Sequence, residues 1–164
     1  GSSILNRSLE GIINKFDKQS IQVLWQTGDI DYNKYKKYKN DSIKIVPFIN
    51  DMAGAYALSD LVVCRSGALT LSEVTTCGKP SILIPFAAAA GNHQMKNAET
   101  LFQAGASVLI KEKELNTERL FKSINYLINN KNTLKKMSLA AKVLGKPNAT
   151  KKITDYVVDM VSNV

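Results

Sequence analysis

The sequence predicts an α/β protein with a doubly wound, mostly parallel, Rossmann-like sheet and helices on both faces. Three observations indicate this class. Short apolar runs rich in β-branched residues alternate with stretches of helical periodicity, turn-forming residues separate them, and no internal repeat interrupts the alternation. A length of 164 residues is typical of one domain with a proper core, so we expect residues 1–164 to form a single domain.

The first half of the chain alternates between helix and strand. Apolar residues recur three and four positions apart in residues 4–15, which predicts an amphipathic helix. The apolar run 21–26 ends at Thr27-Gly28, as a strand does before a turn. The same criteria predict a helix at 32–39, a strand at 43–48, a helix at 51–59 and a strand at 61–64.

The second half continues the pattern and then becomes helical. A helix at 69–77 is expected to end at Gly78-Lys79-Pro80, because glycine favours a helix C-cap and proline stops the helix. Asn116 and Asn148 are expected N-caps. The remaining expected elements are a strand at 81–85, a helix at 92–104, a strand at 106–110 and helices at 116–129, 132–144 and 148–161.

Composition excludes several classes of protein. Apolar residues make up 45% of the chain and charged residues 22%, which is ordinary for a globular protein. The longest apolar runs are too short to span a membrane, and no secretory signal opens the chain. Cys64 and Cys77 are expected to be reduced structural thiols. No Cys/His cluster has metal-ligand spacing, so we expect neither a metal nor a cofactor.

A net charge of +8 needs a separate explanation. The lysines are scattered over several expected helices and are not interleaved with stacking aromatic residues, so we expect no nucleic acid partner. Solvated helix faces account for the lysines, and attraction to an anionic membrane surface stays open.

Candidate site residues follow the carboxyl ends of expected strands, where ligands bind in open parallel sheets. The turn after strand 61–64 opens a helix, and the free N–H groups and dipole of a helix N-terminus favour an anion. Glu73 lies about a turn later, within reach of hydroxyls beside that anion. Polar residues after strand 81–85 add neutral hydrogen-bonding groups, which together indicate a nucleotide-sugar site. The residues from these two segments are Arg65, Ser66, Gly67, Ala68, Leu69, Thr70, Glu73, Asn92, His93, Gln94 and Asn97.

Some of these residues have structural alternatives. Glu73 can equally be a solvated carboxylate that is favourable to the helix dipole. His93 can be a polar residue at a helix start with no ligand, and Arg65 can pair with a carboxylate inside the protein.

An ordered set of short segments resembles the donor-binding half of the MurG family of UDP-N-acetylglucosamine transferases. The segments are Pro47-Phe48-Ile49-Asn50-Asp51-Met52-Ala53, Ala55-Tyr56-Ala57, Asp60 to Glu73, Gly78-Lys79-Pro80, Ile84-Pro85-Phe86, Asn92-His93-Gln94, Asn97-Ala98 and Gly105-Ala106. The resemblance covers most of the chain. It implies one half of a GT-B fold, without the first strand, its glycine-rich loop and the acceptor-binding domain.

The resemblance also implies roles for individual residues. The backbone of Ile49 would contact the uracil edge, in a pocket lined by Phe48 and Met52. The turn at residues 68–70 would donate to the diphosphate, and Glu73 would bind the ribose hydroxyls.

For the sugar, the resemblance implies that His93 and Gln94 contact the N-acetylglucosamine hydroxyls and that Asn97 supports their loop. Ala87-Ala88-Ala89-Ala90 departs from the family, which commonly has a proline-containing or polar loop there. No catalytic residue is assigned.

The implied reaction is inverting transfer of N-acetylglucosamine from the UDP donor to a lipid-linked N-acetylmuramyl-pentapeptide in peptidoglycan synthesis. The enzyme would be peripheral, at the cytoplasmic face of the bacterial inner membrane, and would serve cell-wall growth, cell shape and cell division. The isolated chain is expected to be inactive.

Other functions stay open from sequence alone. They are another GT-B transferase or an epimerase that uses a UDP-sugar, a non-catalytic or engineered UDP-binding module, and a basic nucleic-acid binder.

Overall fold

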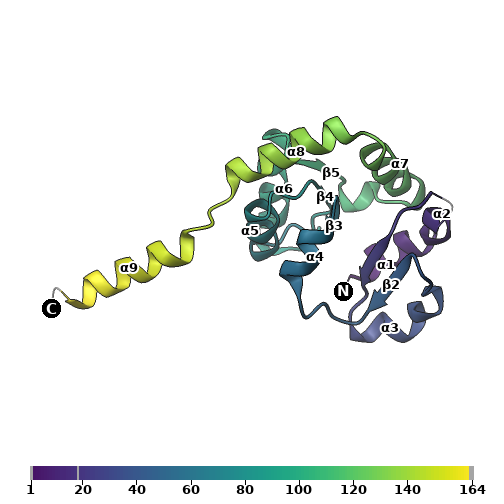
Figure 1. The fold of residues 1–164 in the computed structure, drawn as a ribbon, viewed down its shortest axis with the longest axis horizontal. Helices are drawn as coiled ribbons and strands as arrows, with labels where there is room; N and C mark the ends of the chain where they lie inside the picture. Colours follow the sequence, from purple (N-terminus) through teal and green to yellow (C-terminus); the bar gives the residue numbers. More distant parts are fainter. Residues whose placement is uncertain (1, 18, 163–164) are drawn as a thin grey trace.

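The computed structural model describes residues 2–17 and 19–162, which form alternating helices and strands followed by helices alone (Figure 1). The elements are α1 (Ser3–Glu10), α2 (Ile13–Asp17), β1 (Val23–Gln26), α3 (Asp29–Tyr35), η1 (Lys36–Tyr38), β2 (Ile43–Val46), α4 (Met52–Leu58), β3 (Val62–Cys64), α5 (Ala68–Thr76), β4 (Ser81–Leu83), η2 (Ala90–Asn92), α6 (His93–Gln103), β5 (Ser107–Leu109), η3 (Glu112–Glu114), α7 (Thr117–Ile128), α8 (Lys131–Leu144) and α9 (Ala149–Ser162).

Every strand pairing in the described residues is parallel, which confirms the predicted α/β class. The strands form two sheets, however. One has the order β1-β2, with Trp25 opposite Ile45, and the other has the order β3-β4-β5, with Cys64 opposite Leu83 and Leu83 opposite Leu109. The sequence pattern predicted a single sheet, so this division is new information from the structure.

One hydrophobic core joins the two sheets. Trp25 and Ile45 from the first sheet belong to the same buried cluster as Ile82 from the second and Leu127 from α7. All three residues of β4 are buried, as expected for a strand covered on both faces of a parallel sheet. The core therefore holds both sheets in one body.

The first expected helix is divided in two. Helix α1 ends at Gly11 and α2 begins at Ile13, whereas the sequence predicted one helix over 4–15. A Cβ on Gly11 would lie 2.7 Å from the side chain of Thr117, so glycine allows the backbone to approach α7 closely at this point. Contact with a distant helix, which periodicity cannot show, decides where α1 ends.

Asparagine and aspartate side chains fix several helix starts. The carboxamide oxygen of Asn116 accepts from the N–H of Arg119, as predicted. Asn130 caps α8 in the same way, two residues before the expected start of that helix. Asp51 caps α4 by accepting from the N–H of Gly54. The N-cap role of Asn148 stays a prediction.

Helix α9 projects away from the rest of the molecule (Figure 1). All its described residues are exposed, including the apolar side chains of Ile153, Tyr156, Val157 and Met160. Within residues 2–17 and 19–162, no helix combines the length and hydropathy that crossing a bilayer requires.

Candidate functional site

The turn between β3 and α5 presents free backbone donors. Gly67 is the N-cap of α5 in an extended conformation, and its carbonyl accepts from the N–H of Leu71. The first N–H groups of a helix have no intrahelical acceptor, and those of Ala68, Leu69 and Thr70 have no partner within the described part of the chain. A Cβ built on Gly67 would meet nothing within 4 Å, so the space beside the turn is open. The arrangement suits a small anion.

Hydrogen bonds join this turn to the start of α6. The buried hydroxyl of Ser66 donates to the carbonyl of Gln94 over 2.7 Å, and the amide of Asn97 donates to the carbonyl of Ser66 over 3.2 Å. The two segments that the sequence placed after neighbouring strands therefore lie side by side.

The side chains at the start of α6 are partly engaged already. The Oε1 of Gln94 accepts from the N–H of Phe86 over 3.0 Å, and the NH₂ group of Gln94, which has no partner among the described residues, can donate to a ligand. The Nδ1 of His93 lies 2.6 Å from the carbonyl oxygen of Ala90 and must carry a proton to bond to it, so Nε2 is an acceptor in the neutral ring. Asn92 precedes them in the left-handed conformation, with an exposed side chain.

Arg65 is bound within the protein. Its Nη1 donates to the carbonyls of Ile84 and Pro85, both over 3.1 Å, and forms an ion pair with Glu112. Its guanidinium also lies 5.4 Å from the centre of the Phe86 ring. These contacts connect the carboxyl ends of β3 and β4 with η3. Any contact between Arg65 and a ligand would have to use its other nitrogens.

Glu73 is half-buried and held by a neighbouring helix. Its Oε2 accepts from the hydroxyl of Tyr56 on α4 over 3.0 Å. Burial, and next the hydrogen bond to Glu73, raise the pKa of Tyr56 well above its usual range, so this hydroxyl remains a donor at neutral pH. The other oxygen, Oε1, has no partner among the described residues and can accept from a ligand hydroxyl.

The three residues expected around a base lie after β2 and at the start of α4. Phe48 is 62% exposed and Met52 is half-buried. The N–H of Ile49 donates to Oε1 of Gln26 over 3.0 Å, so the carbonyl of Ile49 is the backbone group left for a base. The positions of Phe48, Ile49 and Met52 are compatible with a flat ligand. The N–H of Ile49, however, is already bonded to Gln26 and is one donor fewer than expected for a base.

Sequence reasoning assigned no role at this site to three residues that position it: Gln26, Tyr56 and Glu112. Each contacts its partner across 17 to 47 residues of chain. No local spacing links such pairs, so only the fold could identify them.

No group of three or more His, Cys, Asp or Glu side chains is placed to hold a metal ion in the part of the chain that the structure describes. The candidate anion site at the start of α5 consists of backbone donors.

Comparison with known proteins shows that the sequence is similar to glycosyltransferases. The model of the glycosyltransferase family 28 C-terminal domain matches residues 1–153. The transferase of Thermodesulfovibrio yellowstonii named UDP-N-acetylglucosamine–N-acetylmuramyl-(pentapeptide) pyrophosphoryl-undecaprenol N-acetylglucosamine transferase is 47% identical over 141 residues, which cover 84% of this chain and 38% of that protein. The transferase of the same name from Anaeromyxobacter sp. (strain K) is 43% identical over 98% of this chain and 43% of its own length.

Solved structures agree with this relationship. The crystal structure of Acinetobacter baumannii MurG matches all of this chain and 47% of its own, with a TM-score of 0.83 and 30% identity. The glycotransferase of kitacinnamycin matches with a TM-score of 0.70 at 18% identity, which supports the fold alone. The chain thus spans less than half the length of these relatives. With residues 1–153 matched, it belongs to the glycosyltransferase family 28 C-terminal domain family.

Proposed function

We propose that this chain is the donor-binding part of a transferase that uses UDP-N-acetylglucosamine. The observation that carries the proposal is the open N-terminus of α5, where the N–H groups of Ala68, Leu69 and Thr70 lack partners among the described residues. Such donors, aided by the helix dipole, suit the diphosphate of a nucleotide-sugar.

Groups on both sides of this turn supply the rest of the nucleotide contact. The free Oε1 of Glu73 accepts from ribose hydroxyls, while Tyr56 holds the carboxylate in place. The carbonyl of Ile49 accepts from the uracil ring, and the exposed ring of Phe48 and the side chain of Met52 pack against the base.

The sugar lies at the start of α6 in this proposal. The NH₂ of Gln94 donates to sugar hydroxyls and Nε2 of His93 accepts from one. Asn97 and Ser66 keep this segment beside the diphosphate turn, since they join the two segments by hydrogen bonds.

The reaction step assigned to this chain is stabilisation of the leaving group. When the bond from the sugar to the diphosphate breaks, negative charge develops on UDP, and fixed backbone donors lower the energy of that charge. The acceptor hydroxyl attacks the sugar carbon from the opposite face and loses its proton to a base. We assign no base within residues 1–164.

We propose a lipid-linked N-acetylmuramyl-pentapeptide as the acceptor, because the names of the related transferases specify it. Its undecaprenol carrier would place the reaction at a membrane surface, and we propose the cytoplasmic face of the bacterial inner membrane. The net charge of +8 is compatible with attraction to anionic lipids. We expect binding of the donor, but no transfer, by the isolated 164-residue chain.

Nucleotide titration tests the proposal. UDP, ADP and GDP are titrated into the chain by calorimetry or by ¹H–¹⁵N NMR in the presence of EDTA. We expect UDP to bind most tightly, with a Kd in the high micromolar to millimolar range, roughly −4 to −6 kcal/mol. Equal affinity for the three nucleotides would refute selection of uracil, and a requirement for divalent metal would refute the backbone-only diphosphate site.

A panel of UDP-sugars separates the sugar proposal from its alternatives. Preference for UDP-N-acetylglucosamine over UDP-glucose and UDP-galactose supports the assignment. Conversion of a UDP-sugar into its epimer would instead identify an epimerase.

A further inference from the structure

The side chain of Gln26 connects the two strands of the first sheet at their carboxyl ends. Gln26 is the last residue of β1, and its Oε1 accepts over 3.0 Å from the N–H of Ile49, which lies three residues after β2. Since an N–H can only donate, the oxygen of the carboxamide must face Ile49, and the NH₂ group lies on its other branch. Two side-chain donors therefore lie next to the backbone group that is expected to contact a base.

The polar groups around this contact are available to a ligand. The NH₂ of Gln26 and the carbonyl of Ile49 have no partner among the described residues. Gln26 is half-buried and shares a face of β1 with Leu24, which is 44% exposed, because alternate residues of a strand point the same way. Trp25, between them, is buried in the core. The carboxamide is thus on the side of β1 that a ligand can reach.

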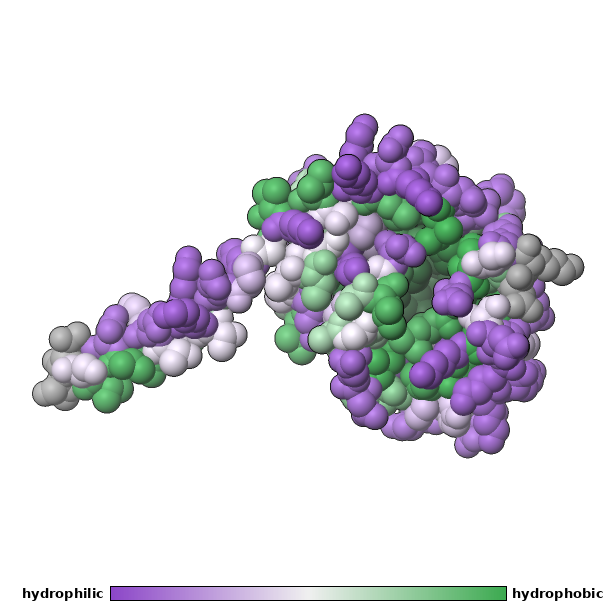
Figure 2. Space-filling view, in the orientation of Figure 1, coloured by the Kyte–Doolittle hydropathy of each residue, from purple (hydrophilic) through white to green (hydrophobic). Residues whose placement is uncertain are grey.

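Apolar surface accompanies these polar groups. Phe48, the neighbour of Ile49 in the chain, has an exposed ring, as Leu24 has an exposed side chain on β1. Figure 2 shows hydrophobic surface gathered inside a polar rim, between the part of the molecule that carries β3 and the part that carries β2. A flat ring that covers apolar surface excludes water from its own edge, so an unpaired donor or acceptor at that edge costs more free energy than in water.

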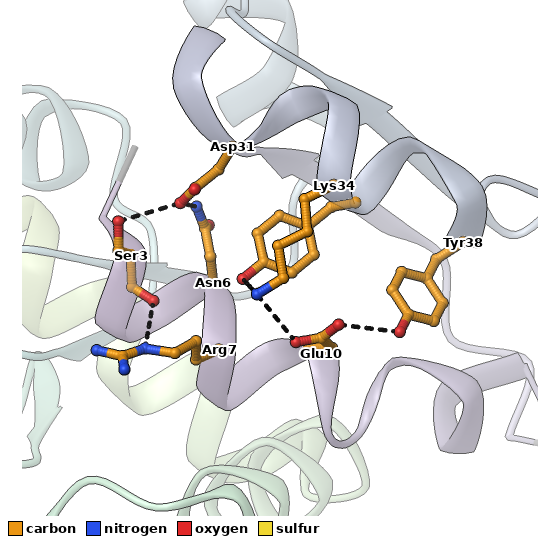
Figure 3. A network of polar contacts seen from close by, with 8 residues as sticks. Ser3, Asn6, Arg7, Glu10, Asp31, Lys34 and Tyr38 are labelled. Carbon is orange, nitrogen blue, oxygen red and sulfur yellow. Dashed lines mark hydrogen bonds and ion pairs between the residues drawn. The ribbon is translucent and has the colours of Figure 1, made fainter.

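Hydrogen bonds to Asn6 fix the strand end that carries Gln26. The amide of the buried Asn6 donates to the carbonyl of Thr27, and its Oδ1 accepts from Nε1 of Trp25, both over 2.9 Å. Asn6 also donates to Asp31, and Figure 3 shows this contact between α1 and α3. Since one side chain holds the residues on both sides of Gln26, the carboxamide is preorganised, and little ordering is needed when a ligand binds.

The carbonyl of Ile49 and the NH₂ of Gln26 complement one edge of uracil. Uracil has an N3–H donor next to the O4 acceptor, whereas cytosine has an N3 acceptor next to an N4 amino group. A protein acceptor beside a protein donor therefore pairs with both groups of uracil and opposes both groups of cytosine. The N–H of Ile49 is already bonded to Gln26, and the NH₂ of the same side chain takes its place as the donor.

We propose that Gln26 determines the selectivity of this site for uracil over cytosine. Its Oε1 keeps the N–H of Ile49 occupied and its NH₂ donates to O4 of the base, while the carbonyl of Ile49 accepts from N3–H. The inference rests on the proposed function, because it assigns a specificity-determining side chain within the same nucleotide site.

Gln26→Glu separates this role from a purely structural one. A carboxylate can still accept from the N–H of Ile49, so the connection between the strands is kept, but it has no donor for O4 and can accept from the N4 amino group of cytosine. Gln22→Glu is the matched control, because Gln22 is exposed just before β1 and the change adds the same charge. UDP and CDP are titrated into all three chains by calorimetry. The two ligands share ribose and diphosphate, so the ratio of their Kd values reports on the base alone.

We expect the unmodified chain and Gln22→Glu to bind UDP at least about tenfold more tightly than CDP, and Gln26→Glu to lose that preference. A preference that persists in a folded Gln26→Glu chain would overturn this inference and leave the proposed function intact. An equal loss in Gln22→Glu would show an effect of charge alone and would overturn it as well, as would equal binding of UDP and CDP by the unmodified chain. Failure of that chain to prefer UDP over ADP and GDP would overturn both proposals.

NMR on the unmodified chain covers the case in which Gln26→Glu does not fold. The side-chain ¹H–¹⁵N signals of Gln26 are followed during titration with UDP and CDP. We expect them to shift in the UDP complex, because the NH₂ gains an acceptor, and to shift less in the CDP complex at equal saturation. The N–H of Ile49 should stay protected from hydrogen exchange in both complexes. A UDP complex that leaves the Gln26 side-chain signals unchanged would overturn the inference.

Discussion

The hydroxyl of Tyr56 donates a hydrogen bond of 3.0 Å to the carboxylate of Glu73. Tyr56 is 5% exposed and comes from α4, whereas Glu73 comes from the second turn of α5. The bond therefore connects the helix that follows the expected base pocket with the helix that begins at the expected diphosphate turn. It holds one carboxylate oxygen, and the other has no partner in the part of the chain that the structure describes.

Replacement of Tyr56 by phenylalanine tests this positioning role. We expect Tyr56→Phe to weaken UDP binding by about 0.5–1.5 kcal/mol, the usual contribution of one hydrogen bond, because Glu73 loses its fixed orientation. Affinity is measured by calorimetry at pH 7.5. Unchanged affinity would show that Glu73 does not depend on Tyr56.

The same substitution predicts a difference at alkaline pH. The pKa of Tyr56 is raised in the folded state, so its protonated form is favoured there and its stabilising contribution is complete below the ordinary value of 10.0. That contribution is lost as pH rises above this value. The free energy of unfolding of the parent chain should therefore fall more steeply above pH 10 than that of Tyr56→Phe. Parallel curves would contradict the shift.

Glu73 itself is tested with two substitutions. We expect Glu73→Ala to weaken UDP binding by about 1.5–3 kcal/mol, the range for a hydrogen bond to a charged group. Glu73→Gln keeps an acceptor for Tyr56, so it should preserve stability better than Glu73→Ala. With 2′,3′-dideoxy-UDP the loss should be much smaller. An equal loss for both ligands would show that Glu73 does not bind the ribose.

Gln94 is expected to affect the sugar more than the nucleotide. UDP-N-acetylglucosamine should bind no more than about tenfold more tightly than UDP, roughly 1.4 kcal/mol, and Gln94→Ala should remove that difference. Gln103→Ala, at the far end of α6, is the matched control. A large preference for the sugar that persists in Gln94→Ala would place the sugar elsewhere.

The two thiols should differ in reactivity. Cys64 is half-buried, and loss of solvent around its thiol raises the pKa of Cys64 to about 12, whereas Cys77 is exposed. Since the thiolate is the nucleophile, Cys77 should react with iodoacetamide at pH 8 more than about 100-fold faster than Cys64. Peptide mass spectrometry measures both rates, and Cys77→Ser should lack the fast reaction. Comparable rates would contradict the raised pKa of Cys64.

Sequence patterns predicted the order of elements well because each strand and helix has local signals. Val62–Cys64 and Ser81–Leu83 are short apolar runs bounded by turn residues, and both are strands. The juxtaposition of Ser66 with Gln94 also followed, since parallel strands bring the segments after their carboxyl ends to one edge.

The features of the fold and the site that the sequence did not predict depend on contacts between residues far apart in the chain. The break of the first helix at Gly11 results from its closeness to Thr117. The engagement of the Ile49 N–H by Gln26 and of Arg65 by Glu112 has no signature in local spacing. The two-sheet arrangement depends on which strands pair, and hydrophobic periodicity does not specify pairing partners.

The central claim, that the N-terminus of α5 binds a diphosphate through its backbone, is tested most directly by Ala68→Pro. Ala68 is the first residue of α5, where proline is tolerated, and the extended conformation of Gly67 (φ −64°, ψ 147°) suits a residue before proline. The substitution therefore removes one N–H donor and keeps the helix.

Thr117→Pro at the first position of α7, which follows the extended N-cap Asn116, is the matched control. Calorimetry with UDP should show a loss of about 1.5–3 kcal/mol for Ala68→Pro and no loss for Thr117→Pro. UDP affinity that is unchanged in a folded Ala68→Pro chain would contradict the account.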